Sequence, residues 1–141
     1  MLIRPCAEFT ADFPDDMVEE DGEVIQFGGR AVADAISQML RSRSYAVTPP
    51  EHQGEHGWDF EVKVEKRRIW IQISDLGDCF VLSSKCYAGL IPRRQDEIIY
   101  ASVLTVLNEG LAADGRFSNV RWLLQRDVQT GAPGAEAPVA S

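Results

Sequence analysis

The residues with the clearest potential for chemistry are two histidines on either side of a glutamate, in the segment His52-Gln53-Gly54-Glu55-His56. Histidines at positions i and i+4 can hold a zinc ion, with the glutamate as a base, provided that all three side chains project from one helix. Here Pro49 and Pro50 precede the segment and a glycine interrupts it, which favours a solvated loop. His52 and His56 are therefore only weak metal candidates, and we expect no cofactor.

The same five residues resemble the H-x-x-E-H zinc-binding motif of one class of zinc peptidases. That resemblance implies a metal-dependent hydrolase with the two histidines as ligands. Because the proline- and glycine-rich context leaves little room for the helix that the motif needs, a small hydrolase is only the second alternative function.

A thiol nucleophile is the other route to catalysis, with Cys79 or Cys86 attacking and His52 or His56 as its base. The two cysteines flank the apolar run Phe80–Leu82, where burial would raise the pKa of a thiol and make it inert. We therefore predict no catalytic site and no enzyme. The three cysteines are odd in number and have no framework spacing, which indicates free thiols in a reducing cytoplasm.

Charge is unevenly distributed along the 141 residues, whose formal net charge is −8. Residues 1–27 contain eight acidic residues against a single arginine, so nearly all of the excess lies there. Such a surface repels phosphate groups, which makes nucleic acids and anionic membranes poor partners, whereas a basic protein would be attracted. We predict that such a partner contacts Asp15, Asp16, Glu19 and Glu20; the alternative is that these acids only keep the segment soluble.

The elements that position these residues follow from hydrophobic periodicity. Apolar residues with helical spacing run from Val32 to Leu40 and from Ile99 to Leu111, and they predict two helices. Period-two alternation predicts a hairpin over residues 58–64 and 69–73. Three more strands are expected, at 45–47, 79–84 and 120–124.

These elements predict a single α+β domain over residues 28–126, with two helices packed on one face of an antiparallel meander sheet. Residues 1–27 are expected to form an acidic N-terminal arm. Residues 127–141 have almost no large apolar side chain, so we expect a disordered C-terminal tail.

Strand alternation also predicts which side chains face outward. If Trp58 and Phe60 face the helices, then Asp59 and Glu61 point to solvent, and Trp70 and Gln72 of the paired strand share that face. A tryptophan on a polar sheet face is typical of the centre of a protein interface. We predict that Asp59, Glu61, Trp70 and Gln72 contact a partner, with a second copy of the chain or the acidic arm as alternative covers.

In size, acidity and the order of helix, meander and helix, the chain resembles two groups of bacterial accessory proteins, and the likeness covers roughly Gly28–Leu124. One group is the small immunity proteins that neutralise a toxin, and the other is the acidic secretion chaperones that dimerise and hold an effector. The first resemblance implies a non-enzymatic cytoplasmic inhibitor whose arm and Trp70 face occlude a basic toxin or nuclease. The second implies a homodimeric adaptor, which is the alternative function.

Overall fold

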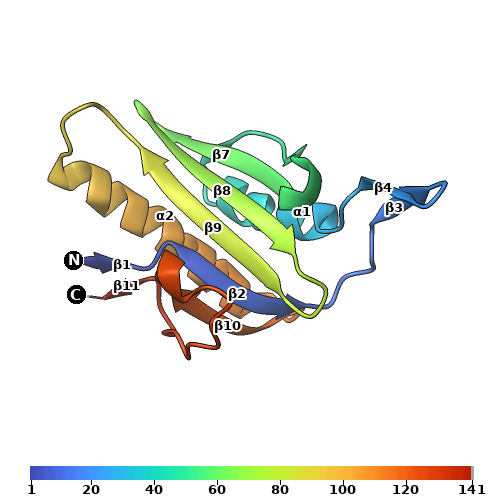
Figure 1. Cartoon of the computed structure of the whole chain (residues 1–141). Helices are drawn as coiled ribbons and strands as arrows, with labels where there is room; N and C mark the ends of the chain where they lie inside the picture. Colours follow the sequence, from blue (N-terminus) through green and yellow to red (C-terminus); the bar gives the residue numbers. More distant parts are fainter. Residues whose placement is uncertain (141) are drawn as a thin grey trace.

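The computed structural model describes residues 1–140 and contains two α-helices and eleven strands within them (Figure 1). The helices are α1 (Arg30–Arg41) and α2 (Arg94–Ala113). The strands are β1 (Leu2–Ile3), β2 (Cys6–Ala11), β3 (Val18–Glu20), β4 (Glu23–Gln26), β5 (Ala46–Val47), β6 (Glu51–His52), β7 (Trp58–Val64), β8 (Arg67–Asp75), β9 (Phe80–Tyr87), β10 (Phe117–Leu123) and β11 (Val139–Ala140). Two short 3-10 helices, η1 (Gly54–His56) and η2 (Gln125–Asp127), lie in loops.

A seven-stranded antiparallel sheet forms the centre of the molecule, in the order β10–β2–β9–β8–β7–β5, with β6 also paired to β7. The predicted hairpin of β7 and β8 is present, with Phe60 opposite Ile71 and Glu61 opposite Trp70. Alternate side chains of these strands are buried against the helices, as period two requires: Trp58, Phe60, Val62, Ile69, Ile71 and Ile73.

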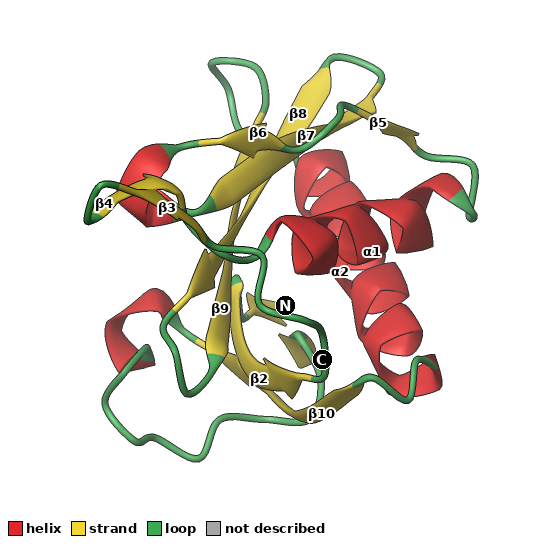
Figure 2. Ribbon diagram, turned by 90° about the vertical axis from the view of Figure 1, so that its right-hand side faces the viewer, coloured by secondary structure: helices red, strands yellow, loops and turns green. Residues whose placement is uncertain are grey.

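Both helices cover one face of this sheet (Figure 2), which confirms the predicted α+β class. Their buried residues recur at helical spacing and include Ile36 and Leu40 in α1 and Leu107 and Leu111 in α2. The helices approach closely at Gly110, where an added Cβ would lie 2.7 Å from the sulfur of Met39. A larger residue at Gly110 would therefore require the Met39 side chain to move.

The prediction of an arm over residues 1–27 is wrong for Cys6–Ala11, which forms strand β2 between β9 and β10. Its side chains alternate between the core, where Ala7 and Phe9 are buried, and the outer face of the sheet. The acidic composition of the segment suggested an exposed arm, whereas Glu8 is itself buried in this strand. The Glu8 carboxylate accepts hydrogen bonds from Arg121, at 2.8 Å, and from the Gln129 N–H, at 2.7 Å.

The expected disordered tail also differs from the structure, in which the chain from 127 to 140 returns along the sheet. Ala135 exchanges two backbone hydrogen bonds with Trp122, and β11 pairs with β1 beside the N-terminus. Backbone pairing of this kind needs no large apolar side chain, so composition alone could not reveal it. Residue 141 lies outside the described residues.

Within residues 1–140, neither helix combines the length and the apolar character that crossing a bilayer requires.

The central position of β2 predicts that its buried side chains contribute strongly to stability. Phe9 is 1% exposed and lies between the rings of Phe80 and Phe117, with centroid distances of 5.8 and 5.6 Å. We expect Phe9→Ala to lower the free energy of unfolding by about 3–5 kcal/mol in a urea titration. The control Met17→Ala, at an exposed site, should change it by less than about 0.5 kcal/mol. Equal effects of the two variants would contradict a central β2.

Candidate functional site

Strands β3 and β4 form a two-stranded hairpin that projects from one end of the molecule (Figure 1). Its turn is Asp21–Gly22, and both residues have positive φ, 53° and 82°, as the type I′ turn of a tight hairpin requires. The Asp-Gly pair between two short extended runs is the sequence signal for this element. The predicted irregular arm over residues 1–27 did not include this hairpin.

Asp16 fixes one side of the hairpin base to helix α1. Its two carboxylate oxygens accept the backbone N–H groups of Gly29, at 2.9 Å, and of Ala31, at 2.8 Å. Gly29 is the N-cap residue of α1 and has no side chain to fill that role, so a carboxylate from outside the helix does so. The negative charge also suits the positive end of the helix dipole. Asp16, predicted as a partner contact, is therefore a structural cap.

Phe27 fixes the other side of the base. Its N–H donates to Nε2 of His52 at 3.0 Å, and its carbonyl accepts the indole N–H of Trp58 at 3.0 Å. The imidazole of His52 also contacts the Trp58 ring, with a centroid distance of 5.0 Å. Together with Asp16, these bonds hold the hairpin in a defined direction, because each strand of its base is tied to the sheet or to α1.

The His52–His56 segment does not form the helix that a zinc motif needs. His52 ends the short strand β6, and His56 is exposed at the end of the 3-10 helix η1. The Nε2 atom of His52 already accepts a hydrogen bond from Phe27. Within residues 1–140 no group of three or more His, Cys, Asp or Glu side chains is arranged to hold a metal ion.

The thiols lie at opposite ends of β9, with Cys79 in the turn before it and Cys86 near its end. Burial raises the pKa of both thiols, and neighbouring carboxylates, Asp78 for Cys79 and Asp96 for Cys86, raise the pKa further. Fewer thiolates form at neutral pH as a result, which weakens both cysteines as nucleophiles.

The hairpin surface combines negative charge with exposed apolar side chains. Residues 12–27 contain seven acidic residues and no basic one. Glu19 and Glu20 are exposed and form none of the ion pairs found within residues 1–140. Four large apolar residues of the same segment are also exposed: Met17, Val18, Val24 and Ile25.

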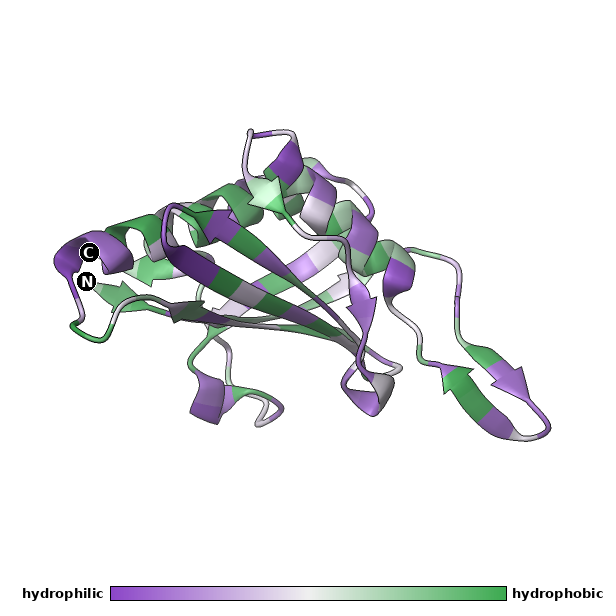
Figure 3. Cartoon of the chain, turned by 90° about the horizontal axis from the view of Figure 1, so that it is seen from above, coloured by the Kyte–Doolittle hydropathy of each residue, from purple (hydrophilic) through white to green (hydrophobic). Residues whose placement is uncertain are grey.

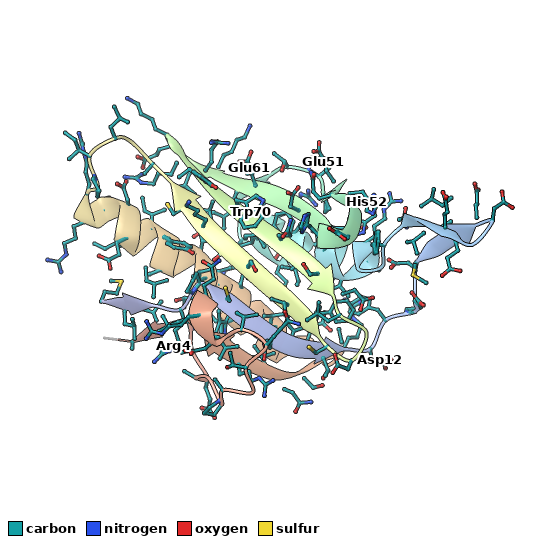
Figure 4. The ribbon with its side chains drawn as sticks, viewed as in Figure 1. Arg4, Asp12, Glu51, His52, Glu61 and Trp70 are labelled. Carbon is teal, nitrogen blue, oxygen red and sulfur yellow. The ribbon has the colours of Figure 1, made fainter. Side chains whose placement is uncertain are left out.

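The outer face of β7 and β8 carries the other predicted contact residues. Trp70 lies opposite Glu61 on the side of the sheet away from the helices (Figure 4), and Asp59 lies opposite Gln72 two residues along the same face. The structure thus brings these four residues together as the alternation predicted. Trp70 is half-buried, and its indole N–H donates to the Asp59 carboxylate at 3.1 Å.

Acidic and basic side chains are both present on this outer face. The Glu61 carboxylate pairs with Arg68 at 2.8 Å, and Lys85 lies opposite Trp70 on β9. Asp59 and Glu61 alone would give Trp70 an acidic surrounding, but Arg68 and Lys85 of the neighbouring strand positions offset them. The uncompensated acids lie on the hairpin, which projects beyond the end of the sheet (Figure 1).

At the opposite end of the molecule, an ion pair joins β8 to α2. Nε of Arg67 lies 2.6 Å from Oδ1 of Asp96, and the other carboxylate oxygen accepts the backbone N–H of Arg93 at 3.0 Å. The hydrogen bond from Arg67 holds the pKa of Asp96 below its usual value. This end also carries the fully exposed Leu90 on the loop between β9 and α2.

No family model, no curated protein and no solved structure matches this chain.

The cap made by Asp16 can be tested by comparing three variants. Asp16→Ala removes both acceptors at the start of α1, so we expect a loss of about 1–2 kcal/mol in the free energy of unfolding. Asp16→Asn keeps one acceptor oxygen and should lose less. Asp15→Ala is the matched control, because the Asp15 carboxylate accepts only the N–H of Met17. A loss for Asp15→Ala as large as that for Asp16→Ala would contradict the cap.

The Arg67–Asp96 pair predicts a pH-dependent contribution to stability. The pKa of Asp96 is lower in the folded state than in the unfolded state, where aspartate has a pKa of about 4. The pair therefore stabilises the fold above about pH 4. This stabilisation is lost as the pH falls through the lower pKa of the folded state. The destabilisation caused by Asp96→Asn, measured by urea unfolding, should therefore be largest near neutral pH and shrink below about pH 4. Glu97→Gln, one residue along α2, is the control and should show no such trend.

Proposed function

We propose that this chain is a non-enzymatic protein-binding module, most closely comparable to an immunity-type inhibitor, that neutralises a basic toxin or nuclease in the cytoplasm. The observation that carries the proposal is the hairpin of β3 and β4. It is acidic, it exposes apolar side chains, and its base is fixed to the rest of the fold.

The charge of the hairpin supports capture of a basic partner. Glu19, Glu20, Asp21 and Glu23 follow one another around a tight turn. At physiological ionic strength the Debye length is about 8 Å, so neighbouring carboxylates within one turn act together on an approaching cation. Their carboxylates would take the place that phosphate groups occupy in a nuclease, and they would accelerate association by electrostatic steering.

Apolar side chains and free strand edges would then hold the complex. Val24 and Ile25 are exposed beside the acids, and Figure 3 shows hydrophilic residues around the turn of the hairpin and hydrophobic ones nearer its base. Within residues 1–140, β3 and β4 pair only with each other, so each keeps one unpaired edge that could add a strand of the partner. The acids also protect these edges from unspecific pairing.

A fixed base favours this role because it reduces the entropy lost on binding. A free acidic arm would have to be ordered at the moment of association, whereas the hairpin is already held by Asp16 and His52. The Trp70 face would supply a second contact with little net charge, since Asp59 and Glu61 are already engaged with Trp70 and Arg68.

The alternative function, a dimeric adaptor for an effector, differs in stoichiometry. An inhibitor of the proposed kind binds one partner through the hairpin, whereas an adaptor needs two copies of the chain to form one binding surface. The mass of the purified complex separates the two.

The test of the proposed function is affinity capture from native lysate at low salt, followed by binding kinetics with the identified protein. We expect a basic partner whose association slows steeply as salt rises, and Glu19→Gln/Glu20→Gln to reduce the association rate on the order of tenfold. Asp16 stays unchanged in this variant because it caps α1.

Glu55→Gln/Glu97→Gln removes the same charge from exposed sites elsewhere and is the matched control. A partner whose association rate does not change with salt, or that binds both double variants equally well, would contradict the proposed function.

A further inference from the structure

The end of the molecule opposite the hairpin is basic and apolar. Here the turn between β7 and β8 faces the loop between β9 and α2, and a groove of about 700 Å³ lies between them. Leu90 in this loop is completely exposed and Ile91 is 75% exposed. No other large apolar side chain within residues 1–140 is as exposed as these two. Such a tip is costly in water unless something covers it.

Positive charges slightly outnumber negative ones around this exposed tip, where Arg67 is paired with Glu65 and with Asp96, and Glu97 lies on the first turn of α2. Lys66, Arg93 and Arg94 are exposed, and none of them takes part in the ion pairs found within residues 1–140. The wall of the groove is rigid, because the Arg67–Asp96 pair joins the turn to the start of α2. We name this surface, consisting of Lys66, Leu90, Ile91, Arg93 and Arg94, the basic end.

The hairpin has the complementary properties. It carries exposed carboxylates and exposed apolar side chains, and it offers free strand edges. In Figure 1 the hairpin and the β9–α2 loop lie at opposite sides of the molecule. Because the hairpin base is tied to α1 and β6, it cannot fold back across the sheet to reach the basic end. Only the hairpin of another molecule can meet it.

We propose that the basic end binds the acidic hairpin of a second copy of this chain, so that molecules associate head to tail. The carboxylates of Glu19 and Glu20 would pair with Arg93 and Arg94, while Leu90 and the apolar side chains of the hairpin exclude water between them. The two surfaces are different, so this contact is heterologous and extends into a ring or an open chain. It goes beyond the proposed function, since it needs no foreign partner, and a basic partner would compete for the same hairpin.

Two variants test the proposal by sedimentation velocity at low salt, and each changes only one of the two contact surfaces. Arg93→Gln/Arg94→Gln weakens the basic end and Glu19→Gln/Glu20→Gln weakens the hairpin. We expect the unchanged chain to self-associate, and each variant alone to do so at least about tenfold more weakly. An equimolar mixture of the two variants should form a heterodimer that grows no further, because only one intact contact can form in it.

Arg126→Glu changes the net charge by the same amount as Arg93→Gln/Arg94→Gln, at an exposed site away from the basic end, and is the control. It should associate like the unchanged chain. Raising the ionic strength from about 0.1 M to about 1 M, which shortens the Debye length from about 10 Å to about 3 Å, should dissolve the assemblies.

Three outcomes would overturn the proposal. The unchanged chain could stay monomeric at every concentration tested. The two variants could associate as strongly as the unchanged chain, which would place self-association on another surface, such as the Trp70 face. Anionic vesicles could bind the monomer in an Arg93- and Arg94-dependent way while no head-to-tail contact forms, which would make the basic end a membrane surface. None of these outcomes bears on whether a foreign basic partner binds the hairpin.

Discussion

Strand β2 is the constraint on which the rest of this structure depends. It lies between β9 and β10, so without it the sheet would separate into the meander of β7, β8 and β9 and the isolated strand β10. Phe9 belongs to the core and packs against Phe80 and Phe117, and Glu8 ties the returning C-terminal segment to the outer face. Burial of a carboxylate is tolerated here because both of its oxygens accept hydrogen bonds, one of them from a guanidinium.

The same constraint explains how an acidic segment can act as a defined element. The hairpin leaves the body immediately after β2 and returns immediately before α1, and both flanking elements are part of the core. Asp16 and His52 then fix its base from two sides. The seven acids of residues 12–27 are therefore held at one end of the molecule, while the exposed basic residues around Leu90 lie at the other. The formal net charge of −8 therefore does not describe the local charge at either end of the molecule.

Local sequence patterns predicted the elements in which the spacing of apolar side chains shows which face is buried. Alternation placed β7 and β8 and the shared face of Asp59, Glu61, Trp70 and Gln72, and helical spacing placed both helices. The failures come from long-range pairing. Nothing in the sequence of β2 shows that residues 117–123 and 80–82 will lie on either side of it, and composition cannot show that Ala135 pairs with Trp122. The hairpin is the exception, since its Asp21–Gly22 turn was readable.

The central claim, that the projecting hairpin is the binding element, is tested most directly by amide hydrogen exchange on the complex with a captured partner. The account predicts slowed exchange in residues 17–26, above all at the strand edges that are unpaired in the free protein, with little change in β2. Slowed exchange confined to the outer face around Trp70, with the hairpin exchanging as fast as in the free protein, would contradict it.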